Sequence, residues 1–322
     1  MSQSVQEQLN QWGIEKTPFV FLIDFECHKP MCWSLYEPIE DLEYNFNGFT
    51  NIISDKHSKK IFNEIVEIIK DPITFKQYQQ KFNYVKKEIE YGNSFLVNLT
   101  TLTKIETNLS LNFIAHNSNS KYVCYLKDQF VSFSPETFIQ IKNGKIIAFP
   151  MKGTIDANIP NAEELILSDT KELAEHATIV DLIRNDLSKV ANNVRVTKYR
   201  YYEQIKTQQG IIGQVSSEIE GTLPNNYNEK IGDIIFDLLP AGSVSGAPKN
   251  KTKEIIAKVE EVERGYYTGV AGYFDGTNLD SCVLIRFLEV NNIYRSGGGI
   301  TAQSDALKEY NEMINKVYVP AF

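Results

Sequence analysis

The chain has 322 residues, with 33 basic and 41 acidic side chains and a net charge of −8. This acidic balance excludes a general nucleic-acid binder, whose electrostatic footprint is a basic excess. We expect no membrane partner, because no apolar run reaches about 18 residues, and a cytoplasmic protein, because the first 16 residues lack an apolar signal core. The four cysteines are then expected to remain thiols, since no second Cys/His pair follows at zinc spacing.

Apolar patterning and turn residues predict the first elements. Residues 18–25 (PFVFLIDF) are typical of a buried strand. Asp71-Pro72 favours the start of a helix, since Asp can cap and Pro suits the first turn. Apolar residues then recur at helical spacing until Gly92, which predicts the helix end. Residues 95–103 (FLVNLTTLT) are rich in β-branched side chains and predict a strand.

Asn143-Gly144 is a strong signal for a two-residue hairpin. In such a hairpin Lys142 faces Lys145, and continuing the ladder would put Glu136 opposite Met151. The amine of Lys152 would then lie near the Glu136 carboxylate at the open end of the hairpin. From geometry alone, a rim salt bridge that contributes little stability is the better interpretation.

Residues 161–190 are predicted to be helical. One expected apolar stripe includes Leu173 and Ala177, and a second face runs from Glu175 to Asp186 with acids at both ends. A carboxylate there is either a solvated edge or a ligand directed into a site. Polar residues inside a buried helix must pair internally.

Two glycine-rich segments predict exposed backbone N–H groups. Residues 240–249 (PAGSVSGAPK) precede a helix, whose N-terminus can bind an anion, and residues 296–300 (SGGGI) are expected to form a turn. Each alone is explained by a tight turn without a ligand, but two in one chain favour an anion site. Neither has the spacing of a Walker A loop or a dinucleotide fingerprint.

Glu309 and Glu312 lie at positions i and i+3, with Lys316 one turn further. Two carboxylates on one helical face repel unless they are exposed or share a cation. Oxygen-only ligands suit Mg²⁺, but the residues alone favour a solvated face.

Eight segments, in this order, resemble the chorismate-utilising enzymes, a family of anthranilate, aminodeoxychorismate, isochorismate and salicylate synthases: SPETF, PMKGT, AEHATIVDLIRNDLSKV, PAGSVSGAPK, RGYYTGVAGYF, LIRFLEV, SGGGI and SDALKEYNEMINK. The resemblance implies an α+β fold of two stacked antiparallel sheets flanked by helices, with the active site between them. We expect one chorismate-binding unit over 1–322, with a shortened N-terminal part (about 1–90) and the family core at about 90–322. Because the N-terminal part is short, we do not expect feedback inhibition by tryptophan.

The lysine of PMKGT selects the branch of the family. Aminodeoxychorismate synthases resemble this chain in carrying Lys at the position of Lys152, where anthranilate synthases usually have Ala. The resemblance implies that the Lys152 amine attacks C2 of chorismate, with Glu136 as the general acid for the C4 hydroxyl, before ammonia attacks C4. Isochorismate and salicylate synthases instead use a lysine that aligns with Leu96, and many amino-transferring members have Gln there.

The remaining site residues follow from the resemblance. Mg²⁺ would be held by Glu175, Glu309 and Glu312 and would bind the ring carboxylate of the substrate. That carboxylate would also receive backbone N–H groups, and the pyruvyl carboxylate would meet a cationic pocket. The backbone groups are those of Gly153, Thr154 and Ser245, and the pocket comprises Arg286, Tyr267, Lys316 and the segment from Gly297 to Gly299.

The chain departs from the family where a His is usual, since Gln209 or Gly210 stands there. Retaining the enolpyruvyl group needs no such acid, so this loss also favours the aminodeoxychorismate branch. The chain lacks a Cys/His/Glu pattern for glutamine hydrolysis, so ammonia would come from a glutamine amidotransferase subunit and reach the site close to Lys152. The alternatives are anthranilate synthase component I and an inactive chorismate-binding regulatory subunit.

Overall fold

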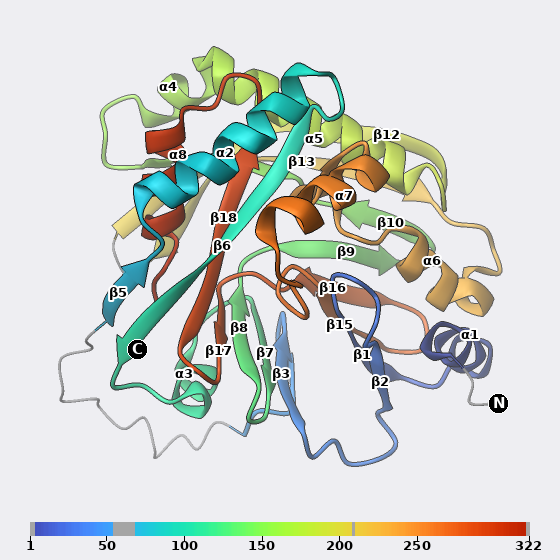
Figure 1. Cartoon of the computed structure of the whole chain (residues 1–322). Helices are drawn as coiled ribbons and strands as arrows, with labels where there is room; N and C mark the ends of the chain where they lie inside the picture. Colours follow the sequence, from blue (N-terminus) through green and yellow to red (C-terminus); the bar gives the residue numbers. More distant parts are fainter. Residues whose placement is uncertain (1–3, 54–67, 208–209, 320–322) are drawn as a thin grey trace.

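The computed structural model describes residues 4–53, 68–207 and 210–319, which fold into two antiparallel β-sheets with helices around them (Figure 1). Within these residues no helix is both long and apolar enough to cross a membrane. The N-terminal part supplies strands to both sheets, so it is an integral part of the fold.

The first sheet has the strand order β11-β13-β10-β9-β16-β15-β1-β2, and β12 pairs with β13 beside this path. Its strands are β1 (Phe19–Ile23), β2 (Met31–Ser34), β9 (Thr137–Lys142), β10 (Lys145–Ala148), β11 (Met151–Asp156), β12 (Asn192–Thr207), β13 (Gly210–Thr222), β15 (Val270–Phe274) and β16 (Leu279–Val283).

The second sheet has the order β14-β6-β18-β17-β8-β7-β3-β4, and β5 pairs with β6. Its strands are β3 (Leu42–Phe46), β4 (Phe49–Thr50), β5 (Ile68–Pro72), β6 (Leu96–Thr107), β7 (Tyr122–Leu126), β8 (Phe130–Ser134), β14 (Gly246–Ala247), β17 (Phe287–Glu289) and β18 (Ile293–Ile300).

Helices cover the outer faces of the sheets. The helices are α1 (Val5–Glu15), α2 (Phe75–Glu90), α3 (Leu111–Asn117), α4 (Ala162–Ser168), α5 (Thr170–Leu187), α6 (Ile231–Asp237), α7 (Lys249–Glu260) and α8 (Ala306–Asn315), with short 3-10 turns η1 (Tyr227–Lys230) and η2 (Gly242–Val244). Side chains of β1 alternate between two cores. Phe19 and Phe21 pack with α1, α5 and α6, whereas Val20 and Leu22 pack between the sheets. The expected buried strand is therefore confirmed, because both of its faces are covered.

The helix expected after Asp71-Pro72 begins later, at Phe75. Asp71 and Pro72 instead end β5, whose backbone pairs with β6. Thr74 is the helix N-cap, and its side chain and that of Gln77 form a reciprocal capping box. The predicted end is confirmed, since the helix closes at Glu90 just before Gly92, whose φ is +79°.

The hairpin at Asn143-Gly144 is confirmed, with Lys142 opposite Lys145. The longer ladder is wrong: β10 ends at Ala148, and β11 pairs with β13 instead of β9. Pro150 explains the break, because it has no N–H to donate to β9 and its carbonyl accepts a hydrogen bond from the Ser217 N–H at 2.9 Å. Glu136 and Met151 are therefore not ladder partners.

The helical region after residue 161 is divided at Asp169, which caps α5 through the Glu172 N–H. The expected first apolar stripe is confirmed only in its second half: Leu173 and Ala177 are exposed, whereas Val180 and Leu187 of the same stripe are buried in the core. The second face also carries buried residues, Glu175, Ile179 and Asp186. The acids at its two ends are thus both buried.

The segment SGGGI is part of strand β18 rather than a turn, which corrects the expectation. A Cβ on Gly297 would lie 2.3 Å from the Leu99 carbonyl oxygen of the neighbouring strand, so a close approach of two strands requires glycine there. The glycines therefore flatten one wall between the sheets.

Arg264 is a buried cation that joins several segments. Its side chain is 1% exposed, and it pairs with the Glu260 carboxylate at 2.6 Å. It also donates to the carbonyl oxygens of Val244 at 2.8 Å and Asn98 at 2.7 Å. The guanidinium thus ties α7 to β6 and to η2.

We expect Arg264→Met to lower the free energy of unfolding by about 3–5 kcal/mol, because it leaves the Glu260 charge buried without its partner. Urea unfolding monitored by tryptophan fluorescence measures this loss. Arg195→Met is the matched control: its side chain is 71% exposed and 3.8 Å from Glu220, so we expect a change below about 0.5 kcal/mol. Equal unfolding midpoints for the two variants would contradict the role of Arg264.

Candidate active site

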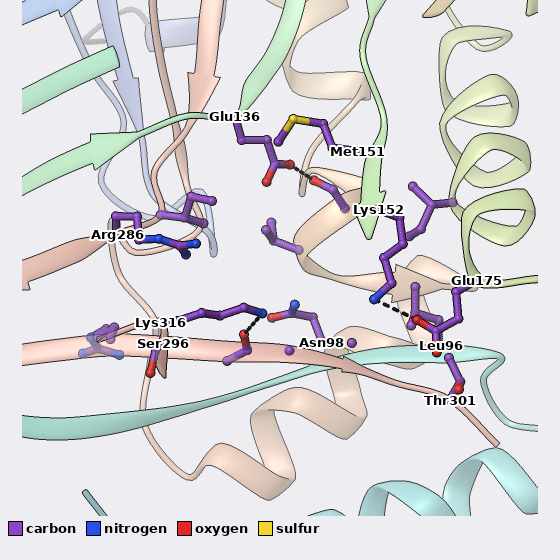
Figure 2. A pocket seen from close by; sticks show the side chains of 18 of the residues that line it. Leu96, Asn98, Glu136, Met151, Lys152, Glu175, Arg286, Ser296, Thr301 and Lys316 are labelled. Carbon is purple, nitrogen blue, oxygen red and sulfur yellow. Dashed lines mark hydrogen bonds and ion pairs between the residues drawn. The ribbon is translucent and has the colours of Figure 1, made fainter. Parts of the chain in front are cut away.

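A cavity of about 150 Å³ lies between the two sheets and the buried face of α5 (Figure 2). Strands β6 and β18 form one wall, and β11, the start of β9 and α5 form the opposite one. Among the described residues, those lining it include the predicted Glu136, Lys152, Glu175, Tyr267, Arg286, Gly297, Gly299 and Lys316. Residues far apart in sequence are thereby brought to one site.

Lys152 projects from β11 and is held by an ion pair. Its Nζ lies 2.8 Å from Glu175 Oε2, and in Figure 2 the amine points toward Glu175 and away from Glu136. Burial disfavours the charged amine, but the Glu175 carboxylate outweighs it and raises the pKa of Lys152 above its ordinary value. In the free protein Lys152 is therefore an ammonium group.

Glu136 lies at the entry to β9 and accepts a hydrogen bond from the Ser243 hydroxyl of η2. Burial raises the pKa of the Glu136 carboxyl, and the Ser243 hydrogen bond offsets part of that rise. A carboxyl group with a raised pKa is suited to donate a proton. Ser243 was missed in the sequence, although it belongs to the same glycine-rich segment as the predicted Ser245.

Arg286 and Lys316 make one end of the cavity cationic (Figure 2). Arg286 stands between β16 and β17, and its Nε donates to the Tyr318 hydroxyl at 3.0 Å. Lys316 Nζ donates to the Gly297 carbonyl oxygen at 2.8 Å and pairs with Glu312 at 2.7 Å. Two cations facing one cavity favour a small anionic ligand.

The three predicted metal ligands come from two helices, α5 and α8. Glu175 and Glu309 are buried, and a Cβ on Gly298 would lie 3.4 Å from Glu309 Oε2 and 3.9 Å from Glu312 Oε1. The missing side chain of Gly298 therefore leaves room beside these two carboxylates. In the part of the chain that the structure describes, no three acidic, His or Cys side chains converge as they would around a metal ion. Lysines bind Glu175 and Glu312 instead.

Three predicted backbone donors do not line the cavity. Ser245 is fully buried, and its carbonyl oxygen accepts the Asn98 N–H at 2.8 Å. Gly153 has a φ of +84°, and a Cβ there would lie 2.9 Å from Glu172 Oε2. Thr154 is exposed on β11.

The structure locates two of the positions at which the sequence departs from the family pattern, Leu96 and Gly210. Leu96 gives the cavity an apolar wall. Gly210 begins β13, opposite Thr207, and Gln209 lies outside the described residues. His176, which sequence reasoning did not single out, is fully buried beside Glu175 and lies 2.6 Å from the Ser217 hydroxyl. Burial lowers the pKa of His176 to about 4, so the imidazole is neutral near pH 7.

This cavity, with a half-buried amine, a carboxyl group of raised pKa and a cationic end, has the equipment of an enzyme acting on a small anion. A family model described as chorismate binding enzyme matches residues 34–321. The chain belongs to this family, and the expected fold of two stacked antiparallel sheets is confirmed. The match takes in residues on both sides of residue 90.

The chain is similar to several known proteins. It is 48% identical to a PabA-like protein of Haemophilus influenzae, over 98% of this chain and 95% of that one. It is 34% identical to anthranilate synthase component 1 of Acetivibrio thermocellus, over 72% of this chain and 49% of that one.

Solved structures agree on the fold. Anthranilate synthase component I from Streptococcus pneumoniae superposes with a TM-score of 0.67 at 29% identity, over 79% of this chain and 59% of that one. The menaquinone-specific isochorismate synthase of Escherichia coli superposes with a TM-score of 0.69 at 17% identity, over 97% of this chain and 80% of that one.

Proposed function

We propose that this enzyme is aminodeoxychorismate synthase component I, which converts chorismate and ammonia to 4-amino-4-deoxychorismate on the route to 4-aminobenzoate and folate. The observation that carries the proposal is the presence of the Lys152 amine and the Glu136 carboxyl in one cavity. An amine that acts as nucleophile at C2 requires a proton donor for the hydroxyl that leaves C4, and the cavity supplies both.

The proposed reaction has two displacements. In the first, the neutral Lys152 amine forms a bond to C2, the ring double bond shifts, and the C4 hydroxyl leaves as water with the Glu136 proton. In the second, ammonia forms a bond to C4, the double bond shifts back, and Lys152 leaves C2. The Glu136 carboxylate takes the proton that the new C4 ammonium group loses. One difficult substitution becomes two easier ones.

The cationic end has a defined part in this reaction. Arg286 and Lys316 would bind the pyruvyl carboxylate of chorismate, and Tyr267 lines the cavity beside them. Leu96 closes the wall where isochorismate synthases have a lysine that activates water, so its apolar side chain favours amination over hydration.

Mg²⁺ fits the donor set of Glu175, Glu309 and Glu312, because all three offer carboxylate oxygens. When bound, the ion would neutralise the ring carboxylate of the substrate. Its binding would require Lys152 and Lys316 to leave their present carboxylate partners.

We expect Glu309→Gln to lose more than about tenfold in Mg²⁺ affinity with little change in unfolding temperature. Isothermal titration with MgCl₂ in the presence of chorismate measures the affinity, and circular dichroism checks the fold. Glu254→Gln is the control, because the Glu254 side chain is on the exposed face of α7 and pairs with Lys251. Full wild-type activity in excess chelator would rule out the metal role.

The test of the function is product analysis by mass spectrometry from chorismate, Mg²⁺ and ammonium. We expect 4-amino-4-deoxychorismate, with a rate that rises as pH increases the free ammonia, and no product with glutamine alone. Glutamine should serve once a cognate amidotransferase subunit is added. Glutamine consumption by the purified chain alone would contradict this division of labour.

Anthranilate synthase component I is the second candidate, because relatives of this name are 34% identical to the chain. Lys152 opposes it, since a lysine at C2 occupies the carbon that receives nitrogen in anthranilate. Anthranilate as the main product would establish it. Failure with both ammonia and the partner subunit would favour a chorismate-binding regulatory subunit.

A further inference from the structure

A second cavity, of about 30 Å³, adjoins the first one and shares Glu136 and Ser243 with it. It lies outside the first sheet, between the ends of β9 and β10, the second half of α5 and the loop before η2. The side chains around it are mostly apolar. They include Phe138, Ala148, Phe149, Ile183, Leu187 and Leu238.

The size of this cavity selects its occupant. A cavity needs about 10–15 Å³ of this kind of volume to hold one water molecule, so about 30 Å³ admits two or three molecules of that size. Chorismate is far too large, whereas ammonia is isoelectronic with water and nearly equal to it in size.

The lining selects the neutral form of such a molecule. Apolar walls disfavour an ammonium ion, whose charge would be buried without a partner. Asp186, which also lines the cavity, is already neutralised: its Oδ1 is 2.8 Å from Lys189 Nζ and its Oδ2 is 2.6 Å from Lys249 Nζ. The Thr137 hydroxyl, which also belongs to a lining residue, is hydrogen-bonded to Lys121 and Tyr122. A small polar molecule therefore meets the Ser243 hydroxyl and the Glu136 carboxyl where the two cavities adjoin.

We propose that this second cavity is the holding site from which ammonia reaches the substrate, past the hydrogen-bonded Ser243 and Glu136 side chains that line both cavities. The inference deepens the proposed function and depends on it. In the second displacement, nitrogen bonds to C4, the carbon whose hydroxyl Glu136 has just protonated. Ammonia is therefore needed beside Glu136, and the cavity lies on that side rather than beside Lys152, where the sequence had suggested entry.

The same geometry supplies the proton balance. After the first step Glu136 is a carboxylate, and ammonia arriving from behind it forms the N–C4 bond while the C2–N bond to Lys152 breaks. The proton released from the new ammonium group returns to Glu136, which is then ready for the next turnover. No additional acid, base or oxidant is required.

Filling the cavity tests the proposal. Ala148 lines the second cavity but not the first. Ala148→Val therefore adds two methyl groups to the second cavity from β10 and leaves the lining of the first cavity unchanged. Ala271→Val is the matched control, since Ala271 is a fully buried alanine on β15 of the same sheet and lines neither cavity. We expect Ala148→Val to raise the KM for free ammonia at least tenfold and to leave the dissociation constant of chorismate unchanged. Ala271→Val should change neither.

A second variant enlarges the cavity instead, which guards against a poorly folded Ala148→Val protein. Ile183→Ala on α5 should raise the ratio of kcat/KM for methylamine to kcat/KM for ammonia at least tenfold. A wild-type KM for ammonia in Ala148→Val together with an unchanged ratio in Ile183→Ala would overturn the holding site while leaving the proposed function intact. If the wild-type protein forms no aminated product from ammonium, the proposed function fails and this inference fails with it.

Discussion

Lys152→Ala is expected to abolish 4-amino-4-deoxychorismate formation, by roughly 10³-fold or more, because loss of a covalent nucleophile removes the first displacement. The Lys152 side chain lines the cavity, and its Nζ lies 2.8 Å from Glu175 Oε2. Its removal leaves space near C2 that ammonia can occupy. Slow formation of anthranilate is therefore the expected residual activity. Mass spectrometry of quenched reactions separates the two products.

The control for this variant is Lys145→Ala, a lysine on strand β10 of the same sheet. Lys145 pairs with Glu220 at the surface, with its side chain 48% exposed, and its loss should leave the rate unchanged. Intact-protein mass spectrometry with chorismate and no ammonia supplies a direct measurement. A mass increase on wild-type protein that is absent from Lys152→Ala identifies the covalent adduct. The same product at the same rate in Lys152→Ala would refute the covalent mechanism.

Glu136→Gln is expected to lower kcat by about 10²–10⁴-fold, the usual contribution of a positioned general acid. Glutamine keeps the size of the side chain but has no proton to give to the leaving hydroxyl. The rate of adduct formation from chorismate, measured without ammonia, isolates this step. A wild-type rate in Glu136→Gln would assign the proton to another group.

The pH dependence gives a second measurement on Glu136. The active form needs a neutral Lys152 and a protonated Glu136, and both groups have a pKa above its ordinary value, which is about 10.4 for lysine and about 4.3 for glutamate. The population of this form is constant between the two pKa values. Below the pKa of Glu136 it falls about tenfold per pH unit, since Glu136 is already protonated and only Lys152 gains protons as pH falls.

In wild-type protein, kcat/KM for chorismate should therefore rise with pH up to the raised pKa of Glu136 and then level. In Glu136→Gln the level region should disappear, because the rate then follows the neutral Lys152 amine alone. Ser243→Ala should move the acid limb to higher pH, because the hydroxyl's hydrogen bond lowers the pKa of Glu136. If neither substitution shifts the acid limb of the pH profile, that limb does not report the titration of Glu136.

The sequence predicted those features of the fold that depend only on residues close together in the chain. The turn at Asn143-Gly144 and its register follow from backbone conformations that these two residues adopt readily, with φ of 52° and 75°. The stacked sheets followed from resemblance to a family. The ladder beyond Ala148 could not be predicted, because a distant strand, β13, competes for the backbone of β11.

The same distinction applies to the site: its residues were predictable from motifs, but the contacts between them were not. Lys152, Glu136 and Arg286 were identified from motifs, and all three line the cavity. The Ser243–Glu136 and Lys152–Glu175 contacts join segments that are distant in sequence, so no local spacing predicts them. The three glycines from Gly297 to Gly299 appeared as a turn because glycine is typical of turns. Gly297 and Gly299 face β6 and Gly298 faces the glutamates of α8, and these close approaches are visible only once all three elements are placed.

The place of β1 has a consequence for how the protein is made. Phe19 pairs with Phe274, so about 250 residues separate the partners, and at roughly 5–20 residues per second a ribosome needs on the order of 13–50 s between them. Throughout that time the strand FVFLI, whose five residues are all buried in the finished fold, has no partner on its β15 side. The nascent chain therefore carries a short, uncharged apolar strand, the kind of segment that is prone to aggregate while it is exposed. Slower synthesis lengthens that exposure.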